Sequence, residues 1–266
     1  MLWSYDDVAD ENTRSYAFAR EPRWIVGHVL VLIAIVVMVN LGLWQLRRLD
    51  ERRDANELVL SRSNGPAVAL SDLPLDAPAD VEFRRVAFTG TFDADHEVLV
   101  GYRTNRGLPG YHVITPLVGA DGDAVLVNRG FVPLSFADDW PVADAAPPAG
   151  EVRVVGLLRR SLESRTKTID AAAAEDATPV LNNVDVPVID RYVPADVVPM
   201  FVELQEPRTR GFPEPLPDLD LGEGSHFSYA VQWFLFTTVA VIGWPIILRR
   251  RAIGVNARTR HRERTA

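Results

Sequence analysis

The sequence contains no cysteine, only three methionines and a single lysine among its 28 basic residues. The absence of cysteine excludes disulfides, thiolate metal sites and thiol-based catalysis. A copper carrier normally supplies soft sulfur ligands, so their scarcity argues against copper handling. The chain also lacks a P-loop, a zinc-protease motif and a dinucleotide-binding glycine motif. We therefore expect that the protein is not an enzyme and has no copper site.

Charge is unevenly distributed along the chain. The formal net charge is -8 at pH 7, which argues against nucleic acid as a partner. Residues 47–226 carry 18 basic and 30 acidic side chains, a net charge of -12. Residues 249–266 instead carry seven arginines and one glutamate, a net charge of +6. A basic segment beside an apolar run is typical of the cytoplasmic side of a membrane and of contact with a lipid bilayer.

Two long apolar runs flank the acidic middle of the chain. Residues 24–46 and residues 227–248 contain no charged side chain. As helices they would be about 33–35 Å long, enough to cross a hydrocarbon core of about 30 Å. The first run is too long for the apolar core of a signal peptide, and no small-residue cleavage site follows it. The sequence therefore predicts two transmembrane helices.

The orientation of these helices is predicted from the arginines around them. Two spans place both termini on the same side. The two tails carry ten arginines, whereas the loop between the spans carries seven within about 20 residues of them. Arg47 and Arg48 argue locally for the opposite orientation, but the total favours cytoplasmic termini in a multi-pass protein of the cell membrane. The predicted segments are a cytoplasmic tail (1–23), a membrane helix (24–46), an extracytoplasmic domain (47–226), a membrane helix (227–248) and a basic cytoplasmic tail (249–266).

The middle of the chain is mostly strand-like. Apolar residues alternate with polar or small ones in residues 83–92, and Asp121-Gly122-Asp123 is a hairpin signal. Helical spacing continues past residue 46 until Pro66, and residues 1–23 have no apolar periodicity. We expect a largely disordered N-terminal tail and an α+β domain. That domain would have about six mostly antiparallel strands and short helices, as a small sheet or a partly open barrel.

The second apolar run begins with a histidine and aromatic residues on one helical face. His226, Tyr229, Ala230 and Trp233 are spaced at i, i+3, i+4 and i+7. Two interpretations stay open from the residues alone. The group is either an anchor in the wet membrane interface, or a site for a flat apolar ligand such as haem, whose commonest protein ligand is imidazole.

Other polar residues of the first run are candidates for the same site. If the two helices are antiparallel neighbours, Trp44 and Gln45 lie at the depth of His226, and Gly42 lets the helices approach closely. The alternative is that the aromatic residues are independent interface anchors. His28 lies at the opposite end of the first run, where it is either functional or a neutral histidine near the membrane edge. It cannot share a ligand with His226.

Two further features lie on adjacent predicted strands of the middle domain. Arg129 interrupts an apolar alternation, and Tyr111 and His112 precede it on the neighbouring strand. An arginine in such a position either pairs with a carboxylate as part of the structure or reaches a binding face.

Five segments in this order resemble the Surfeit-1 family of cytochrome c oxidase assembly factors. The resemblance covers residues 24–250. The segments are LGLWQLRRLDERRDA, FRRVAFTGTFDADHEVLV, RGLPGYHVITPL, DGDAVLVNRGFVP and HFSYAVQWF.

The resemblance implies a role in maturing the haem-copper terminal oxidase. Bacterial members are thought to bind haem a transiently and to aid its insertion into the large oxidase subunit, so haem a synthesis or delivery proteins are expected partners too. A histidine of the second span is the expected iron ligand, and its position here is His226. The other motif positions that carry over are Gly42, Trp44, Gln45, Tyr229 and Trp233. Two alternatives remain, a scaffold for an oxidase subunit without haem and a membrane-anchored enzyme with an outer catalytic domain.

Overall fold

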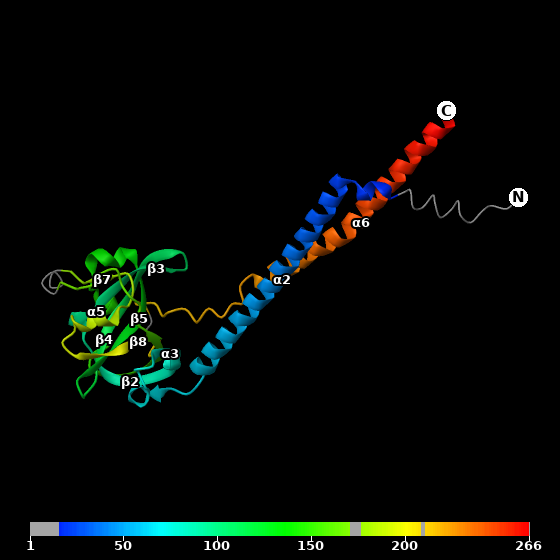
Figure 1. Cartoon of the computed structure of the whole chain (residues 1–266). Coiled ribbons are helices and arrows are strands. Elements are labelled where there is room, and N and C mark those ends of the chain that lie inside the picture. The colour runs from blue at the N-terminus through cyan, green and yellow to red at the C-terminus, as the bar shows by residue number, and fades with distance from the viewer. Residues whose placement is uncertain (1–15, 171–176, 209–210, 266) are drawn as a thin grey trace. The chain divides into compact units, whose positions relative to one another are not determined.

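A computed structural model of the chain consists of two compact units (Figure 1). The helical unit contains the chain up to Asn56 and from Leu221 onward, and the strand unit spans Glu57–Asp220. The structure describes residues 16–170, 177–208 and 211–265, without the side chains of residues 137–139 and 254–265.

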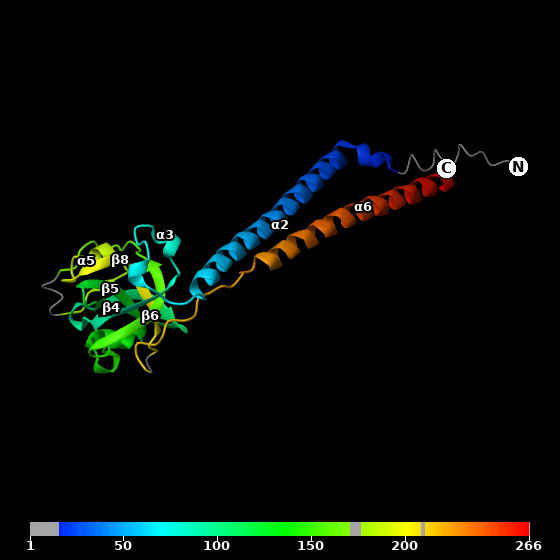
Figure 2. The same ribbon diagram turned by 90° about the horizontal axis from the view of Figure 1, so that it is seen from below.

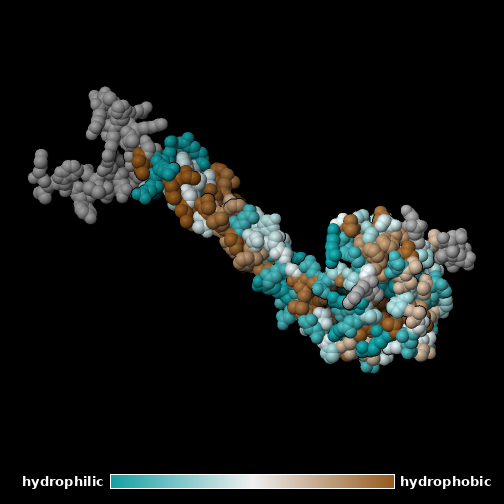
Figure 3. Space-filling view, turned by 180° about the vertical axis from the view of Figure 1, so that it is seen from behind, coloured by the Kyte–Doolittle hydropathy of each residue, from teal (hydrophilic) through white to brown (hydrophobic). Residues whose placement is uncertain are grey.

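Within the described residues, the helical unit is built mainly from two long helices. They are α2 (Pro22–Ser63), whose last residues belong to the strand unit, and α6 (His226–Thr265). Both are long and apolar enough, by length and composition, to cross a membrane. Their apolar side chains face outward along most of this length, as Leu30 (61% exposed) and Val239 (62% exposed) do. Figure 3 shows hydrophobic residues gathered along the helix pair. An exposed apolar surface of this extent needs an apolar surrounding.

The ends of α2 confirm one prediction and correct another. The helix continues beyond Leu46 as far as Ser63, before Pro66, as the uninterrupted helical spacing predicts. The prediction of a largely disordered tail over residues 1–23 is wrong for its last part. The short 3-10 helix η1 (Ala17–Arg20) precedes α2, because Phe18 is buried and its ring packs edge-on against Trp24 with 5.0 Å between centroids. Residues 1–15 lie outside the described part of the chain.

In its described residues, the strand unit contains eight strands, joined by 3-10 turns and two short helices. The sequence predicts six of the strands, and the two that it misses, β1 and β7, have only two residues each. The helices are α3 (Pro78–Val81) and α5 (Val186–Asp190). The 3-10 turns are η2 (Leu70–Asp72), η3 (Ala94–His96), η4 (Leu134–Asp139) and η5 (Ala143–Ala145). The strands are β1 (Val68–Ala69), β2 (Arg85–Phe92), β3 (Val98–Asn105), β4 (Leu108–Val118), β5 (Asp123–Pro133), β6 (Glu151–Arg160), β7 (Val180–Leu181) and β8 (Asp196–Glu206).

Five of these strands close into a ring. Hydrogen-bonded neighbours follow the order β2, β6, β8, β5 and β4, and β4 pairs again with β2. That last contact joins only Thr91 to Val118 and Phe92 to Leu117. Most pairings are antiparallel, whereas β1–β2, β3–β7 and β5–β8 are parallel. The fold is therefore α+β, as predicted, and its central element is a small barrel with a narrow seam.

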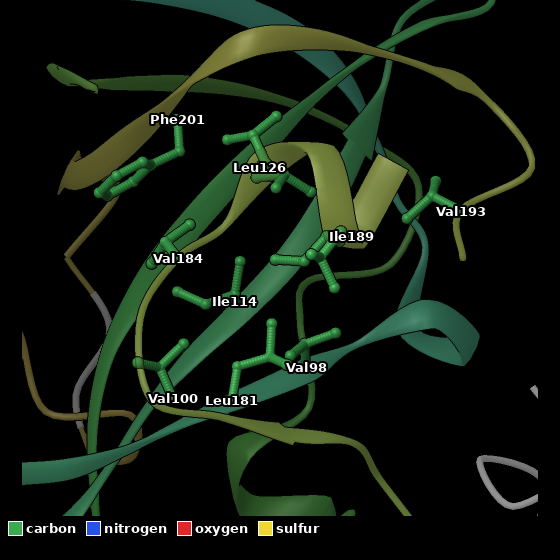
Figure 4. Close-up of a cluster of buried hydrophobic side chains, with 11 residues drawn as sticks. Val98, Val100, Ile114, Leu126, Leu181, Val184, Ile189, Val193 and Phe201 are labelled. Atoms are coloured by element: carbon green, nitrogen blue, oxygen red, sulfur yellow. The ribbon is translucent and has the colours of Figure 1, made fainter. Parts of the chain in front are cut away.

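Apolar side chains are buried on both faces of the central strands. In β5, Val125 and Val127 belong to one core cluster, and Leu126 between them belongs to another. The second cluster contains Leu126 and Phe201 of the sheet together with Ile189 of α5 (Figure 4). Burial of both faces explains why β5 reads as a nearly continuous apolar run.

Arg129 of β5 is part of a buried ion pair. Its Nη2 lies 2.6 Å from Glu97 Oε2, and the two side chains are 3% and 6% exposed. Arg129 Nε also donates to the Thr115 hydroxyl (2.7 Å), which in turn donates to Glu97, and Trp140 Nε1 donates to Glu97 at 3.1 Å. The sequence predicts that Arg129 either pairs with a carboxylate or reaches a binding face, and the structure shows the pair with a carboxylate. Removing either partner would leave an uncompensated buried charge.

His112 of β4 is held in its neutral form by its surroundings. Burial, together with the nearby Arg103 guanidinium, lowers the pKa of His112 from 6.5 to about 4. Its Nδ1 lies 3.2 Å from Asn128 Nδ2, which donates a hydrogen bond to the unprotonated nitrogen. Tyr111, its neighbour, packs against the small cluster around Leu99 and Val113.

We expect this pKa to make stability depend on pH. Between pH 6.5 and about 4 the unfolded chain binds a proton at His112 that the folded protein does not, so the free energy of unfolding falls as pH falls through that window. The full loss is about 3 kcal/mol. Urea unfolding of the detergent-solubilised chain at pH 7 and pH 4.5 measures it. His112→Gln should flatten the difference, and an unchanged difference in this variant contradicts the assignment.

Candidate functional site

The two apolar helices lie side by side (Figures 1 and 2), and glycines of α2 contact aromatic residues of α6 at the two ends of the paired stretch. At one end, Gly42 of α2 lies against the ring of Phe234 of α6, and a Cβ at Gly42 would come within 2.9 Å of that ring. At the other end, Gly27 lies against Trp244, where an added Cβ would come within 3.0 Å. Two glycines on α2 thus allow two large aromatic residues of α6 to approach the helix backbone.

His226 and Gln45 form a direct hydrogen bond at the Gly42 end. His226 Nδ1 lies 2.8 Å from Gln45 Oε1. An amide oxygen only accepts, so Nδ1 carries the proton and donates. The lone pair of the neutral ring is then on Nε2, and the described residues give Nε2 no hydrogen bond. Such an arrangement orients an imidazole and leaves its other nitrogen available as a ligand.

The predicted aromatic residues differ in their surroundings. Trp44 is 46% exposed and Tyr229 is 49% exposed, so each turns a large ring outward. Trp44 immediately precedes Gln45, and Tyr229 follows His226 by three residues. Trp233 is half-buried and packs edge-on against Phe236 with 6.0 Å between centroids. In the described part of the chain, no ring contact joins Trp44 to Tyr229 or to Trp233. The structure therefore brings Gln45 to His226, while Trp44 and Tyr229 remain open for contact.

Polar contacts that the sequence does not signal hold the start of α6 on α2. Arg53 makes a two-pronged ion pair with Glu223, at 2.8 and 3.0 Å. Asn56 Nδ2 donates to the Leu221 carbonyl at 2.7 Å, and Arg52 Nε donates to the Gly222 carbonyl at 3.2 Å. These contacts join residues about 165–170 positions apart, so local sequence patterns do not reveal them. They hold the segment immediately before His226.

His28 lies at the opposite end and has both ring nitrogens engaged. Trp244 Nε1 donates to His28 Nδ1 at 2.8 Å, and His28 Nε2 lies 3.3 Å from the Ala19 carbonyl. Because an indole N–H only donates, His28 Nδ1 is unprotonated and Nε2–H donates to Ala19. The rings of His28 and Trp244 also meet edge-on. His28 therefore joins the two helices and offers no free nitrogen as a ligand.

The residues at the Gly42 end fit a haem group better than a copper ion. They supply one oriented imidazole with a free nitrogen, outward-facing aromatic rings and a surrounding apolar helix surface. A haem group would be held by an imidazole nitrogen on its iron, one of its common protein ligands, and by apolar contact with its macrocycle. Among the described residues, no group of three or more His, Cys, Asp and Glu side chains is placed to hold a metal ion. The expectation that the chain has no copper site stays a prediction.

Comparison with known proteins finds relatives that match most of the chain. The SURF1 family model matches residues 32–238. A SURF1-like protein of Monosiga brevicollis is 32% identical over 227 residues, which cover 81% of this chain and 85% of that protein. A SURF1-like protein of Mycobacterium bovis is 26% identical over 233 residues, 85% of this chain and 84% of that protein. Surfeit locus protein 1 of Arabidopsis thaliana is 34% identical over 131 residues, 45% of this chain and 36% of that protein.

The chain is thus a protein in which two candidate membrane-spanning helices flank a small strand domain. The chain belongs to the SURF1 family, which is known as a family of cytochrome oxidase assembly factors.

We expect the Gly42 contact to set the spacing of the helices. Gly42→Leu places a branched side chain where Phe234 lies, so the helices should separate by about 1–2 Å, the range over which interhelical distances vary with side-chain size. Because the chain has no native cysteine, spin labels on cysteines introduced at Leu43 and Phe227 measure this distance directly. The matched control is Gly243→Leu, since no atom lies within 4 Å of a Cβ at Gly243. Equal distance distributions in the two variants contradict this role.

Proposed function

We propose that this protein is a membrane-bound assembly factor of the haem-copper terminal oxidase that holds haem a transiently at His226. The large oxidase subunit and the proteins that make or deliver haem a are its partners. Membership of the SURF1 family supports the assembly role. The observation that carries the haem part is the 2.8 Å hydrogen bond from His226 Nδ1 to Gln45, which leaves Nε2 free.

The residues around His226 have distinct roles in this proposal. When bound, haem a supplies an iron atom that accepts a nitrogen ligand. Gln45 keeps the proton of His226 on Nδ1 and fixes the plane of the ring. Tyr229, Trp233 and Trp44 supply apolar contact area for a flat ring and exclude water from it. A single protein ligand suits transient holding, since it leaves the other face of a haem to a recipient.

We expect haem occupancy to depend on these residues in a defined order. The full-length chain is purified after co-expression with haem a synthesis, and its absorbance spectrum and haem content are measured. His226→Ala should lose most of the haem and change the spectrum, because a coordinate bond is lost. Gln45→Leu should lower haem affinity by roughly tenfold, as loss of a partner to a ligating histidine commonly does. Trp233→Ala and then Tyr229→Ala should weaken haem retention less.

Substitutions distant from this end of the helices serve as controls. His28→Ala and His112→Ala should keep haem content near that of the unchanged protein. Full occupancy with an unchanged spectrum in His226→Ala would contradict the ligand assignment. A scaffold that stabilises an oxidase subunit without binding haem would then be the better explanation, provided that the protein still copurifies with oxidase subunits.

The proposed topology places both termini in the cytoplasm and the strand unit outside. The charge distribution supports it, with ten arginines in the tails against seven beside the spans in the loop. We expect a reporter that is active only in the cytoplasm to work when fused after Ala266, and to be inactive when inserted near Gly150. Gly150 lies in a turn with a positive φ of 77°, a position that tolerates an insertion. The reverse pattern of activity contradicts this topology.

A further inference from the structure

The barrel seam has an unpaired position in the middle of strand β2. On one side of β2, the parallel pairing with β1 ends at Ala69 opposite Ala87. The pairing with β4 begins only at Thr91, opposite Val118. Thr89 lies between these two pairings, so neither strand reaches it on that side.

The main chain of Thr89 points into this gap. At one end of β2, Asp93 N–H donates to the Pro116 carbonyl, on the β4 side. At the other end, Leu158 N–H donates to the Arg84 carbonyl, on the β6 side. Hydrogen-bonding direction alternates along a strand, so odd-numbered residues of β2 face β1 and β4. The N–H and C=O of Thr89 therefore face the gap, and no described residue on either flank bonds to them.

A groove of about 490 Å³ lies over this position. Its walls are built from small residues, which let another backbone come close to β2. One wall comes from β1 and the turn after it, and the other from the turn between β4 and β5. The small wall residues are Ala67, Ala69, Ser71, Gly119 and Ala120.

One lining residue of the groove carries a positive charge that is not part of an ion pair within the described residues. Arg153 of β6 lies directly opposite Thr89 in the register of β2 and β6, and it lines the groove. Its side chain is exposed and forms no ion pair within the described residues. Asp121 lines the opposite wall. Because both ends of the gap are closed by existing strands, an occupant has room for about three residues in extended form.

We propose that this groove binds an extended segment of another polypeptide, which pairs with the main chain of Thr89 and places an acidic side chain on Arg153. Two hydrogen bonds to Thr89 would fill the missing rung between β1 and β4, the same principle by which many domains add a peptide to a sheet edge. The small walls favour a segment with small side chains beside the paired residue. The groove belongs to the strand unit, and its proposed role does not depend on haem binding.

A library of seven-residue peptides displayed on phage tests this with the full-length chain in detergent micelles. The tightest peptide is synthesised, and its dissociation constant is measured for three variants. Thr89→Pro removes the N–H that faces the gap. It removes no N–H that faces β6, so the hydrogen bonds between β2 and β6 are kept. It should weaken binding by about tenfold or more, whereas the matched control Thr89→Val, which keeps the N–H, should bind within about twofold of the unchanged protein. Arg153→Gln should weaken binding several-fold.

A second measurement separates loss of binding from loss of folding. The peptide is methylated on one backbone nitrogen at a time and tested against the unchanged protein. Sensitivity to methylation at a single position supports strand pairing, since only the peptide N–H that donates to the Thr89 carbonyl faces β2. The proposal is overturned if no peptide is enriched, if Thr89→Pro binds as tightly as Thr89→Val, or if methylation has no effect at any position. It is also overturned if the groove is covered by a second copy of the chain, seen as self-association that Thr89→Pro abolishes.

Discussion

The hydrogen bond between Gln45 and His226 forms only if α2 and α6 lie close together, and other contacts of the helical unit hold the two helices at that distance. Gly42 admits the ring of Phe234, and the Arg53–Glu223 pair holds the chain just before α6. Because the exposed surface of both helices is apolar, a polar pair between them has few competing partners in a lipid surrounding. The position of one proton on His226 is thus set by packing several residues away.

The strand unit is organised around a different constraint, the burial of charge within a closed barrel. Arg129 lies in the strand that is buried on both faces, and it is tolerated there because Glu97, Thr115 and Trp140 satisfy the ion pair. The barrel itself closes through only two residue pairs between β2 and β4. A firm core and a weakly closed seam therefore coexist in one small sheet, and the unpaired Thr89 lies at that seam.

Local sequence patterns were sufficient for most of the fold but not for contacts between distant residues. The charge-free runs, the helix beyond Leu46, the strands from β2 to β6 and strand β8 follow from apolar periodicity and turn residues. The strands β1 and β7 were missed because two residues carry no periodicity, and their pairing is fixed by the rest of the sheet. The pairing of Gln45 with His226 followed only from assuming antiparallel neighbours and from the family resemblance. The Arg53–Glu223 contact had no signal, since exposed charges are common and their partners lie far along the chain.

The two histidines of the helical unit hold their protons on opposite nitrogens. His28 carries its proton on Nε2 because Trp244 occupies Nδ1, whereas His226 carries its proton on Nδ1 because Gln45 accepts from it. The neighbour of each ring therefore decides what that histidine can do. His28 uses both nitrogens in contacts with Trp244 and Ala19, whereas His226 keeps the lone pair of Nε2 available. The same type of side chain thus joins two helices at one end and leaves a nitrogen open to a ligand at the other.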